Sequence, residues 1–283
     1  MRLVRCRACS MVYVNPVQEE IASKRFYEHR SFYVSSDKLE GDYAPVRFER
    51  ELRIFRAWCP AGTVLDVGCS TGGFLNQLKA RYPEAYETLG NDVAGAALDY
   101  AESRGVRVTR EAFLDMDAAK MQFDAITFWA VMEHLVDPGK FLHKSAQMLK
   151  PGGYCFVLVP NFQSLAVRLL GLRYRYITPE HLNYFSPATL KAFARREAVF
   201  QIVDAGSTHF NPMVIWQDFR SRGRIVPDQE RAQLLKRTTV WKQSVFLTPV
   251  KFIYTRTERF LGSMNLADNL FVVLRRTPDS SES

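Results

Sequence analysis

The stretch Val64-Leu65-Asp66-Val67-Gly68-Cys69-Ser70-Thr71-Gly72-Gly73-Phe74 decides the fold of this chain. It opens on an apolar run with β-branched side chains that contains one acid, and a glycine-rich turn follows. Residues 74–82 then have a composition compatible with a helix. A strand, a tight loop and a helix in this order form the first unit of the α/β sheets that bind nucleotides. The sequence therefore predicts an α/β fold with a ligand at the end of this strand.

The position of Asp66, two residues before the first glycine, narrows the class of ligand. Dinucleotide sites place a pyrophosphate on the loop and on the helix N-terminus, where anions are favoured. A carboxylate at the end of the strand is a poor neighbour for pyrophosphate, but it suits a ligand that carries an ammonium and a sulfonium group and no phosphate. The stretch closely resembles motif I of the class I S-adenosylmethionine (SAM)-dependent methyltransferases. This resemblance implies that SAM is the cofactor.

Each residue type in this motif has an expected role in binding the cofactor. The glycines allow a tight turn and a close approach of the ligand to the backbone. Asp66 can accept hydrogen bonds from the amino-acid part of the cofactor, directly or through backbone and water. Cys69 lines the loop, and no base nearby in the sequence would make it a nucleophile. The cofactor-binding residues implied here are Asp66, Gly68, Cys69, Ser70, Gly72 and Gly73.

Asp92 follows a second candidate strand, 24 residues beyond Gly68. A carboxylate there can accept hydrogen bonds from both ribose hydroxyls. NAD sites use the same device, so Asp92 indicates an adenosyl ribose without identifying the cofactor. The alternative is an N-cap for the helix that starts near Ala94. The resemblance adds the neighbouring Val93 to the cofactor-binding residues.

The resemblance also implies an adenine site after the third candidate strand. The family places apolar residues and a carboxylate there, which makes Phe113 and Leu114 candidates for stacking and Asp115 a candidate for the exocyclic amine.

In the same family, helices that precede motif I cover the cofactor. Tyr43 and Arg47 are four residues apart and can face it together. The alternative is that they pack an amphipathic helix against the sheet.

Residues 123–138 resemble the fourth-strand motif of the small-molecule branch of this family, as in the quinone-biosynthesis O-methyltransferases. The portion Glu-His-Leu-x-Asp-Pro at 133–138 is its specific part. This portion lies just past the end of the strand and therefore borders the methyl-transfer site. The resemblance makes Trp129 a cofactor contact and Glu133 and His134 acid/base candidates. For His134, a structural hydrogen bond that holds the loop is the alternative.

A second histidine follows the fifth candidate strand. Many relatives carry a segment similar to Pro179–Pro187, with the pattern His-x-x-x-Phe-Ser. His181 would lie on a loop above the carboxyl ends of the strands, where a general base near neutral pH is useful. Loop anchoring is the alternative. Ser186 before Pro187 predicts an N-cap followed by a proline at the first helical position.

Strands and helices alternate along residues 63–160, which predicts a parallel sheet with right-handed crossovers. The resemblance implies a Rossmann-like α/β fold with a seven-stranded, mostly parallel sheet and helices on both faces. The expected strands are 63–67, 88–91, 106–109, 125–129, 154–159, 200–203 and 269–275. The expected helices are 74–82, 94–103, 138–149 and 187–197, with a turn at 150–153.

The chain divides into five predicted parts. They are a partial zinc-ribbon-like segment at 1–16, an N-terminal helical cap at 17–60, a SAM-binding core at 61–206, a basic, aromatic and mostly helical insert at 207–268, and a last strand with a polar tail at 269–283. The first part rests on one CxxC pair, Cys6 and Cys9. A structural zinc needs four ligands, and the other cysteines are not convincing partners. We therefore expect no bound metal; a start codon placed too far downstream would look the same.

The charge is concentrated in one segment. The net charge is +8, and residues 219–259 hold ten Lys or Arg against three Asp or Glu, a net of +7. Such a segment can attract anionic substrates, nucleic acid or a membrane surface. The alternative is a solvated helical face.

These observations predict an enzyme that moves a methyl group from SAM to a small-molecule acceptor, with S-adenosylhomocysteine (SAH) as product. Acceptors compatible with the sequence are a sugar, a quinone, a polyketide or a lipid-linked precursor, methylated on O, N or C. The first alternative is an RNA-modifying methyltransferase. A non-catalytic SAM-binding protein and an NAD-dependent enzyme are weaker, the latter because of Asp66 and the missing third spaced glycine.

The remaining composition predicts a cytoplasmic protein. No apolar run approaches the ~20 residues that span a bilayer, and no secretion signal opens the chain. The five cysteines are odd in number and, apart from one pair, scattered, which fits a reducing compartment.

Overall fold

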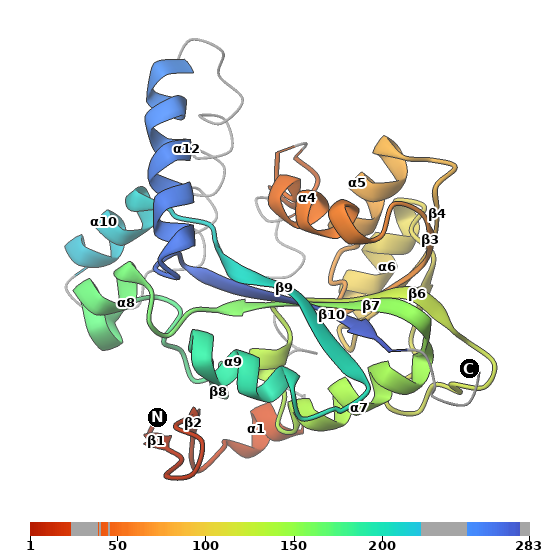
Figure 1. The fold of residues 1–283 in the computed structure, drawn as a ribbon, viewed down its shortest axis with the longest axis horizontal. Coiled ribbons are helices and arrows are strands. Elements are labelled where there is room, and N and C mark those ends of the chain that lie inside the picture. Colours follow the sequence, from red (N-terminus) through yellow and green to blue (C-terminus); the bar gives the residue numbers. More distant parts are fainter. Residues whose placement is uncertain (24–38, 40, 45, 222–247, 278–283) are drawn as a thin grey trace.

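A computed structural model describes residues 1–23, 39, 41–44, 46–221 and 248–277 (Figure 1). Its centre is a seven-stranded sheet in the order β5-β4-β3-β6-β7-β10-β9. The strands are β3 (Gly62–Val67), β4 (Tyr86–Asn91), β5 (Val108–Thr109), β6 (Phe123–Trp129), β7 (Leu149–Pro160), β9 (Phe200–Thr208) and β10 (Asn269–Arg276). Only β10 runs antiparallel to its neighbours in this sheet. The predicted seven-stranded, mostly parallel α/β sheet is confirmed.

Helices cover both faces of the sheet (Figure 1). One face carries α4 (Glu49–Trp58), α5 (Gly73–Arg81) and α6 (Gly95–Ser103), and the other carries α7 (Pro138–Met148) and α9 (Pro187–Ala194). Side chains alternate between the faces along each strand. Val64 and Phe156 pack with the first group, whereas Leu65 and Val157 pack with the second. This two-sided burial explains why the strands read as continuous apolar runs.

Several expected boundaries differ from the structure. Within the predicted helical cap, α4 begins only at Glu49, because residues 46–48 form a turn in which the Arg47 N–H donates to the Ala44 carbonyl. The turn expected at 150–153 lies within β7. Leu149 already pairs with Phe123, and regular pairing resumes at residue 154 after an irregularity.

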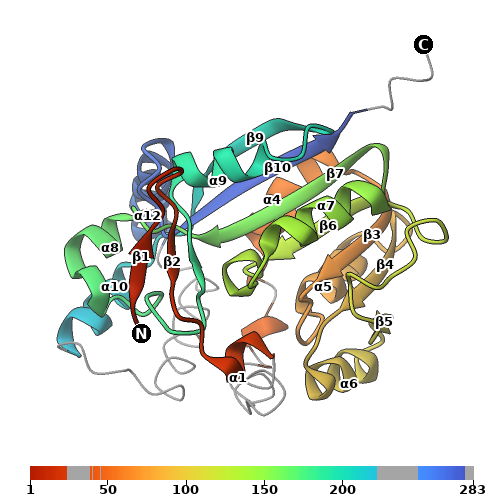
Figure 2. The same ribbon diagram turned by 90° about the horizontal axis from the view of Figure 1, so that it is seen from below.

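The N-terminal segment forms a hairpin of β1 (Leu3–Arg5) and β2 (Val12–Val14). β2 also pairs with β8 (Asn183–Tyr184), which completes a second, three-stranded sheet (Figure 2). The hairpin therefore braces the loop that carries His181. The zinc-ribbon likeness of this segment stays a prediction.

The expected insert is helical where the structure describes it. It contains α10 (Pro212–Arg220) and α12 (Thr248–Ser263), while residues 222–247 lie outside the described residues. Both helices sit at the same end of the sheet as α8 (Leu165–Leu170) and the short helix η3 (Gly171–Arg173) (Figure 1). The predicted cap at 17–60 is described in part, by α1 (Glu19–Ala22) and α4. No helix in the described ranges has the length and apolarity to cross a membrane.

Candidate active site

The glycine-rich loop between β3 and α5 adopts the tight turn that its sequence predicts. Gly68, Ser70 and Gly72 have φ values of +75°, +51° and +76°. The N–H groups of Gly68 and Cys69 donate to the Asn91 carbonyl, at 2.7 and 3.0 Å. These bonds hold the loop against the end of β4.

Gly68 also sets how closely a neighbouring loop approaches. A Cβ on Gly68 would lie 2.4 Å from Val131 Cγ2, so a larger residue would push the two loops apart. Val131 precedes the short helix η2 (Met132–His134), which carries two of the predicted acid/base residues. The motif I loop and the acid/base residues are therefore neighbours in space.

Asp66 is 2% exposed at the end of β3, and its Oδ1 accepts a hydrogen bond of 2.6 Å from the Thr127 hydroxyl. Burial, with a smaller contribution from the charge of Asp92, raises the pKa of Asp66 to about 7. A cationic group bound beside it would favour the ionised form. The cluster of one buried carboxyl and a glycine turn thus fits the ammonium of SAM.

Asp92 links the loop to the start of α6. Its carboxylate accepts from the Ser70 N–H at 2.7 Å and from the Ala94 N–H at 2.9 Å. The second bond is the local backbone contact that the sequence offered as an alternative role. The first bond places the carboxylate at the edge of the motif I loop, where a ribose would lie.

The predicted adenine contacts separate into two groups. Val93 and Leu114 are 45% and 37% exposed, so both side chains are accessible. Phe113 is only 3% exposed and stacks on Phe141 with ring centroids 5.5 Å apart. The stacking role of Phe113 stays a prediction, and in the ligand-free structure its ring packs in the core.

Tyr43 and Arg47 are both linked to the motif I loop. The Tyr43 hydroxyl donates to the Thr71 carbonyl at 2.6 Å. Arg47 lies 3.7 Å from Asp42, whose carboxylate accepts from the Thr71 hydroxyl, and 4.0 Å from Glu51. Cys69 is buried, and burial raises the pKa of its thiol well above the ordinary value, which agrees with a structural role.

Trp129 is the last residue of β6, and its ring packs against Phe74 at the start of α5. Its indole nitrogen is buried and has no hydrogen-bond acceptor among the residues that the structure describes.

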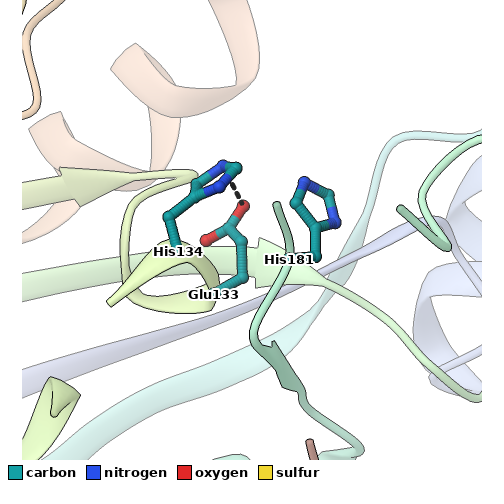
Figure 3. Close-up of side chains that lie close together, drawn as sticks. All are labelled: Glu133, His134 and His181. Carbon is teal, nitrogen blue, oxygen red and sulfur yellow. Dashed lines mark ion pairs between the residues drawn. The ribbon is translucent and has the colours of Figure 1, made fainter. Parts of the chain in front are cut away.

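Glu133, His134 and His181 meet beyond the end of β6 (Figure 3). Glu133 Oε1 lies 3.9 Å from His134 Nε2. The ring centroids of His134 and His181 are 4.6 Å apart in an edge-on arrangement. Glu133 is 1% exposed, and burial raises the pKa of its carboxyl to about 8. Within the described ranges, neither carboxylate oxygen of Glu133 has a hydrogen-bond partner.

Backbone carbonyls orient both histidines. His134 Nδ1 lies 2.9 Å from the Glu180 carbonyl and His181 Nδ1 lies 2.8 Å from the Tyr176 carbonyl. Because a carbonyl only accepts, each Nδ1 carries a proton, and in the neutral ring Nε2 then carries the lone pair. Each histidine can therefore anchor its loop through Nδ1 and act as a base through Nε2. Single ligand atoms of the three side chains lie within 4.8 Å of one another, close enough to share a cation, which the sequence did not predict.

A second polar cluster lies at the same edge of the sheet, and the sequence did not point to it. Glu51 from α4 and Asp268 before β10 are each 4% exposed, and His209 after β9 lies 3.4 Å from Glu51. The three residues are scattered along the chain and form no motif. Only the antiparallel placement of β10 beside β7 and β9 brings the two ends of the insert here.

Comparisons with known proteins agree with this geometry. Residues 44–204 match the family model described as a methyltransferase domain. A ubiquinone biosynthesis O-methyltransferase of Caulobacter vibrioides is 32% identical over 172 residues, which are 56% of this chain and 67% of that protein. Its counterpart from Alkalilimnicola ehrlichii is 29% identical over 62% of this chain and 76% of that protein.

Solved structures share the fold. A SAM-dependent methyltransferase from Archaeoglobus fulgidus superposes with a TM-score of 0.51 at 17% identity, over 87% of this chain and 97% of that one. The N-methyltransferase NodS from Bradyrhizobium japonicum, solved with SAH, gives 0.52 at 14% identity over 91% and 99%. The family match excludes the NAD-dependent alternative. The chain belongs to the SAM-dependent methyltransferases, and SAM is its cofactor.

Proposed function

We propose that this methyltransferase acts on a hydroxyl group of a small-molecule acceptor, with the Glu133–His134–His181 cluster as the site of proton removal. The observation that carries the proposal is the contact between the motif I loop at Gly68 and Val131, which puts this cluster beside the cofactor loop. The O-methyltransferase relatives support the choice of oxygen.

The cofactor residues have distinct proposed roles. Asp66 would hold the ammonium group, Asp92 the ribose, and Val93 and Leu114 the adenine. Gly68, Ser70, Gly72 and Gly73 supply the turn, and Tyr43 and Trp129 border it. Asp92→Ala is expected to abolish SAH binding measured by calorimetry; wild-type affinity in this variant would remove the ribose assignment.

SAM supplies an activated methyl group when it is bound. The protein's part is to hold the acceptor oxygen in line with that group and to take its proton. His181 Nε2 carries a lone pair because Nδ1 donates to the Tyr176 carbonyl. Proton transfer turns His181 into an imidazolium. Glu133, which lies in the same cluster beside His134, can stabilise that cation once the Glu133 carboxyl is ionised.

The test compares His181→Ala with His143→Ala, an exposed histidine on α7. His181→Ala should keep the wild-type affinity for SAH and lose at least about tenfold in turnover, because general-base contributions are of the order of 10²–10⁴. Turnover is measured as SAH release with catechol and with a deproteinised metabolite extract as acceptors. Full activity of His181→Ala would remove the base assignment.

RNA modification is the second candidate function. Two arginines of the basic segment lie over exposed aromatic rings. The Arg220 guanidinium carbon is 4.5 Å from the centroid of the Trp216 ring, and that of Arg256 is 5.1 Å from the centroid of the Phe252 ring. Interleaved cations and aromatic rings on a surface are typical of single-strand binding. Methyl transfer to RNA, with no labelled metabolite in the extract, would favour this candidate.

A further inference from the structure

The helices at one end of the sheet expose several large apolar side chains. α8, η3, α10 and α12 lie at this end, and both views of the molecule place α8, α10 and α12 together there (Figure 1, Figure 2). We call the surface of these four elements the apolar end. Six of its side chains are at least 60% exposed: Leu169, Leu172, Phe219, Phe252, Ile253 and Phe260. Exposed apolar side chains that gather in one place mark an interaction site.

The two faces of α12 differ in a way that is the reverse of a solvated helix. Its one acid, Glu258, is buried on the inner face and pairs with Arg50 of α4. Arg256 and Phe260 follow Phe252 at intervals of four residues, so the three side chains form one row on the outer, exposed face. A solvated helix face is normally polar and charged. The aromatic rings of α12 therefore face outward without a partner in the described part of the chain.

The shorter helix α10 repeats this arrangement. Its one acid, Asp218, is 1% exposed and forms the ion pair of 2.6 Å with Arg175. Trp216, Phe219 and Arg220 are exposed, and the Arg220 guanidinium lies over the Trp216 ring. Both helices thus bury their acid and present arginine and aromatic side chains together.

The exposed charge of the apolar end has a single sign. α8 and η3 contain no acidic residue, and the single acids of α10 and α12 are buried. Every exposed charged side chain in the described part of these elements is an arginine: Arg168, Arg173, Arg220, Arg256 and Arg259. The occupant of this surface must therefore offer negative charge beside apolar groups.

Three kinds of occupant fit these features unequally. A second copy of this chain would bring the same arginines face to face at a symmetric interface, and these helices expose no acid in their described part to pair with them. Single-stranded RNA suits the arginines and the aromatic rings, but bases do not stack on the aliphatic Leu169, Leu172 and Ile253. An anionic bilayer offers phosphate groups to the arginines and acyl chains to all of the apolar side chains.

We propose that the apolar end docks onto a membrane surface that contains anionic phospholipids. The exposed rings and aliphatic side chains enter the boundary between headgroups and acyl chains, and the arginines contact the lipid phosphates. The protein lies on the bilayer without crossing it. This inference goes beyond the proposed function and holds for an acceptor of any class.

The experiment measures binding of the full chain to sedimented vesicles. One set of vesicles contains phosphatidylcholine alone, and the other contains phosphatidylcholine and phosphatidylglycerol in equal amounts. The apolar variant combines Trp216→Ser with Phe260→Ser. The charge variant combines Arg220→Gln with Arg256→Gln.

Matched controls come from exposed positions outside these helices. They are Val199→Ser for the apolar variant and Arg107→Gln for the charge variant. Calorimetry with SAH and thermal unfolding are recorded for every variant, and both should match the wild type because all of the changed side chains are exposed. The comparison of the two vesicle sets with the wild type needs no variant.

The wild type and the controls should bind the anionic vesicles more tightly than the neutral ones, and added salt should weaken this binding. The charge variant should lose about 25-fold in its partition coefficient on anionic vesicles, or about fivefold per arginine. The apolar variant should lose about tenfold or more, because two rings no longer leave water.

Four results would overturn the proposal. They are no binding of the wild type to either vesicle set, equal binding to both sets, and anionic-vesicle binding that is the same in all variants. The fourth is a different occupant in the absence of vesicle binding. A dimer in sedimentation velocity that only the apolar variant dissociates would identify a second copy, and capture of single-stranded RNA that the charge variant loses would identify nucleic acid. SAH binding is unaffected in each case, so the assignment of the cofactor would stand.

Discussion

Asp66 is the residue whose protonation links the fold to the cofactor. Burial raises its pKa to about 7, whereas in an unfolded chain a carboxyl of this type titrates near 4. Between about pH 4 and pH 7, Asp66 is ionised in the unfolded state and protonated in the folded state. The free energy of unfolding of the cofactor-free protein therefore falls as the pH rises through this window. Above pH 7 both states are ionised and this contribution is constant.

The first prediction concerns proton release on binding. A cationic group beside Asp66 favours the carboxylate, so SAM binding at pH 6 should release a proton and SAM affinity should rise with pH up to about 7. Calorimetry at pH 6 in two buffers with different ionisation enthalpies measures the proton count. Asp66→Asn should abolish the difference between the buffers. Equal heats for the wild type in both buffers would contradict the ammonium assignment.

Glu133 allows a second prediction at the same scale. Its carboxyl is neutral below its raised pKa of about 8, and it can stabilise an imidazolium at the proposed base His181 only when it is ionised. Turnover should therefore rise with pH through about pH 8. The pH dependence of kcat should lose this limb in Glu133→Gln. A profile that is identical in the variant would show that Glu133 does not titrate in the reaction.

At the scale of elements, the loop from residue 174 to residue 186 is the structure that the site depends on. It carries Tyr176 and His181 and is held at both ends. Arg175 forms a buried ion pair of 2.6 Å with Asp218 on α10, and β8 pairs with the N-terminal hairpin. A capping box between Ser186 and Thr189 then starts α9, as the Ser-Pro sequence predicted.

The third prediction tests this anchoring. Asp218→Ala leaves the Arg175 guanidinium buried without its partner, which costs about 3 kcal/mol or more. The free energy of unfolding in urea should fall by this amount, and turnover should fall while the SAH affinity stays near the wild-type value. Asp99→Ala, which breaks the exposed pair with Arg110, is the control and should leave both quantities unchanged. Equal effects of the two variants would show that the loop does not depend on Asp218.

At the scale of the whole molecule, the chain consists of a family-matched part and the insert with the last strands that follow it. The family match ends at residue 204, and the sheet then continues through β9 and β10 with the insert between them. The basic segment at 219–259 lies almost entirely in this insert, and the part between α10 and α12 lies outside the described residues.

The fourth prediction separates the two candidate functions at this scale. If the segment of net charge +7 binds RNA, the logarithm of the association constant should fall linearly with the logarithm of salt concentration, by about 0.7 per phosphate contact. Filter binding of a single-stranded RNA across salt concentrations measures this slope. A small-molecule enzyme should show weak binding throughout and a turnover with little dependence on salt.

Several features could be predicted from the sequence because they are local. The motif I loop needs glycines at positive φ, the strands need apolar runs, and Asp92 needs only its place after β4. Such signals lie within a few residues of one another, so the chain order already contains them. The seven-stranded sheet and the cofactor class followed from them.

Other features depended on tertiary packing. The stacking of Phe113 on Phe141 and the exposure of Leu114 could not be predicted from the sequence. The contact between His134 and His181, the approach of Val131 to Gly68 and the cluster of Glu51 with His209 join residues far apart in the chain. No periodicity or spacing encodes these contacts, because they arise only when strand order and helix packing bring separate loops to one edge of the sheet. The sequence by itself determined the fold and the cofactor of this protein, and only the tertiary structure decided which loops meet at the carboxyl edge of the sheet.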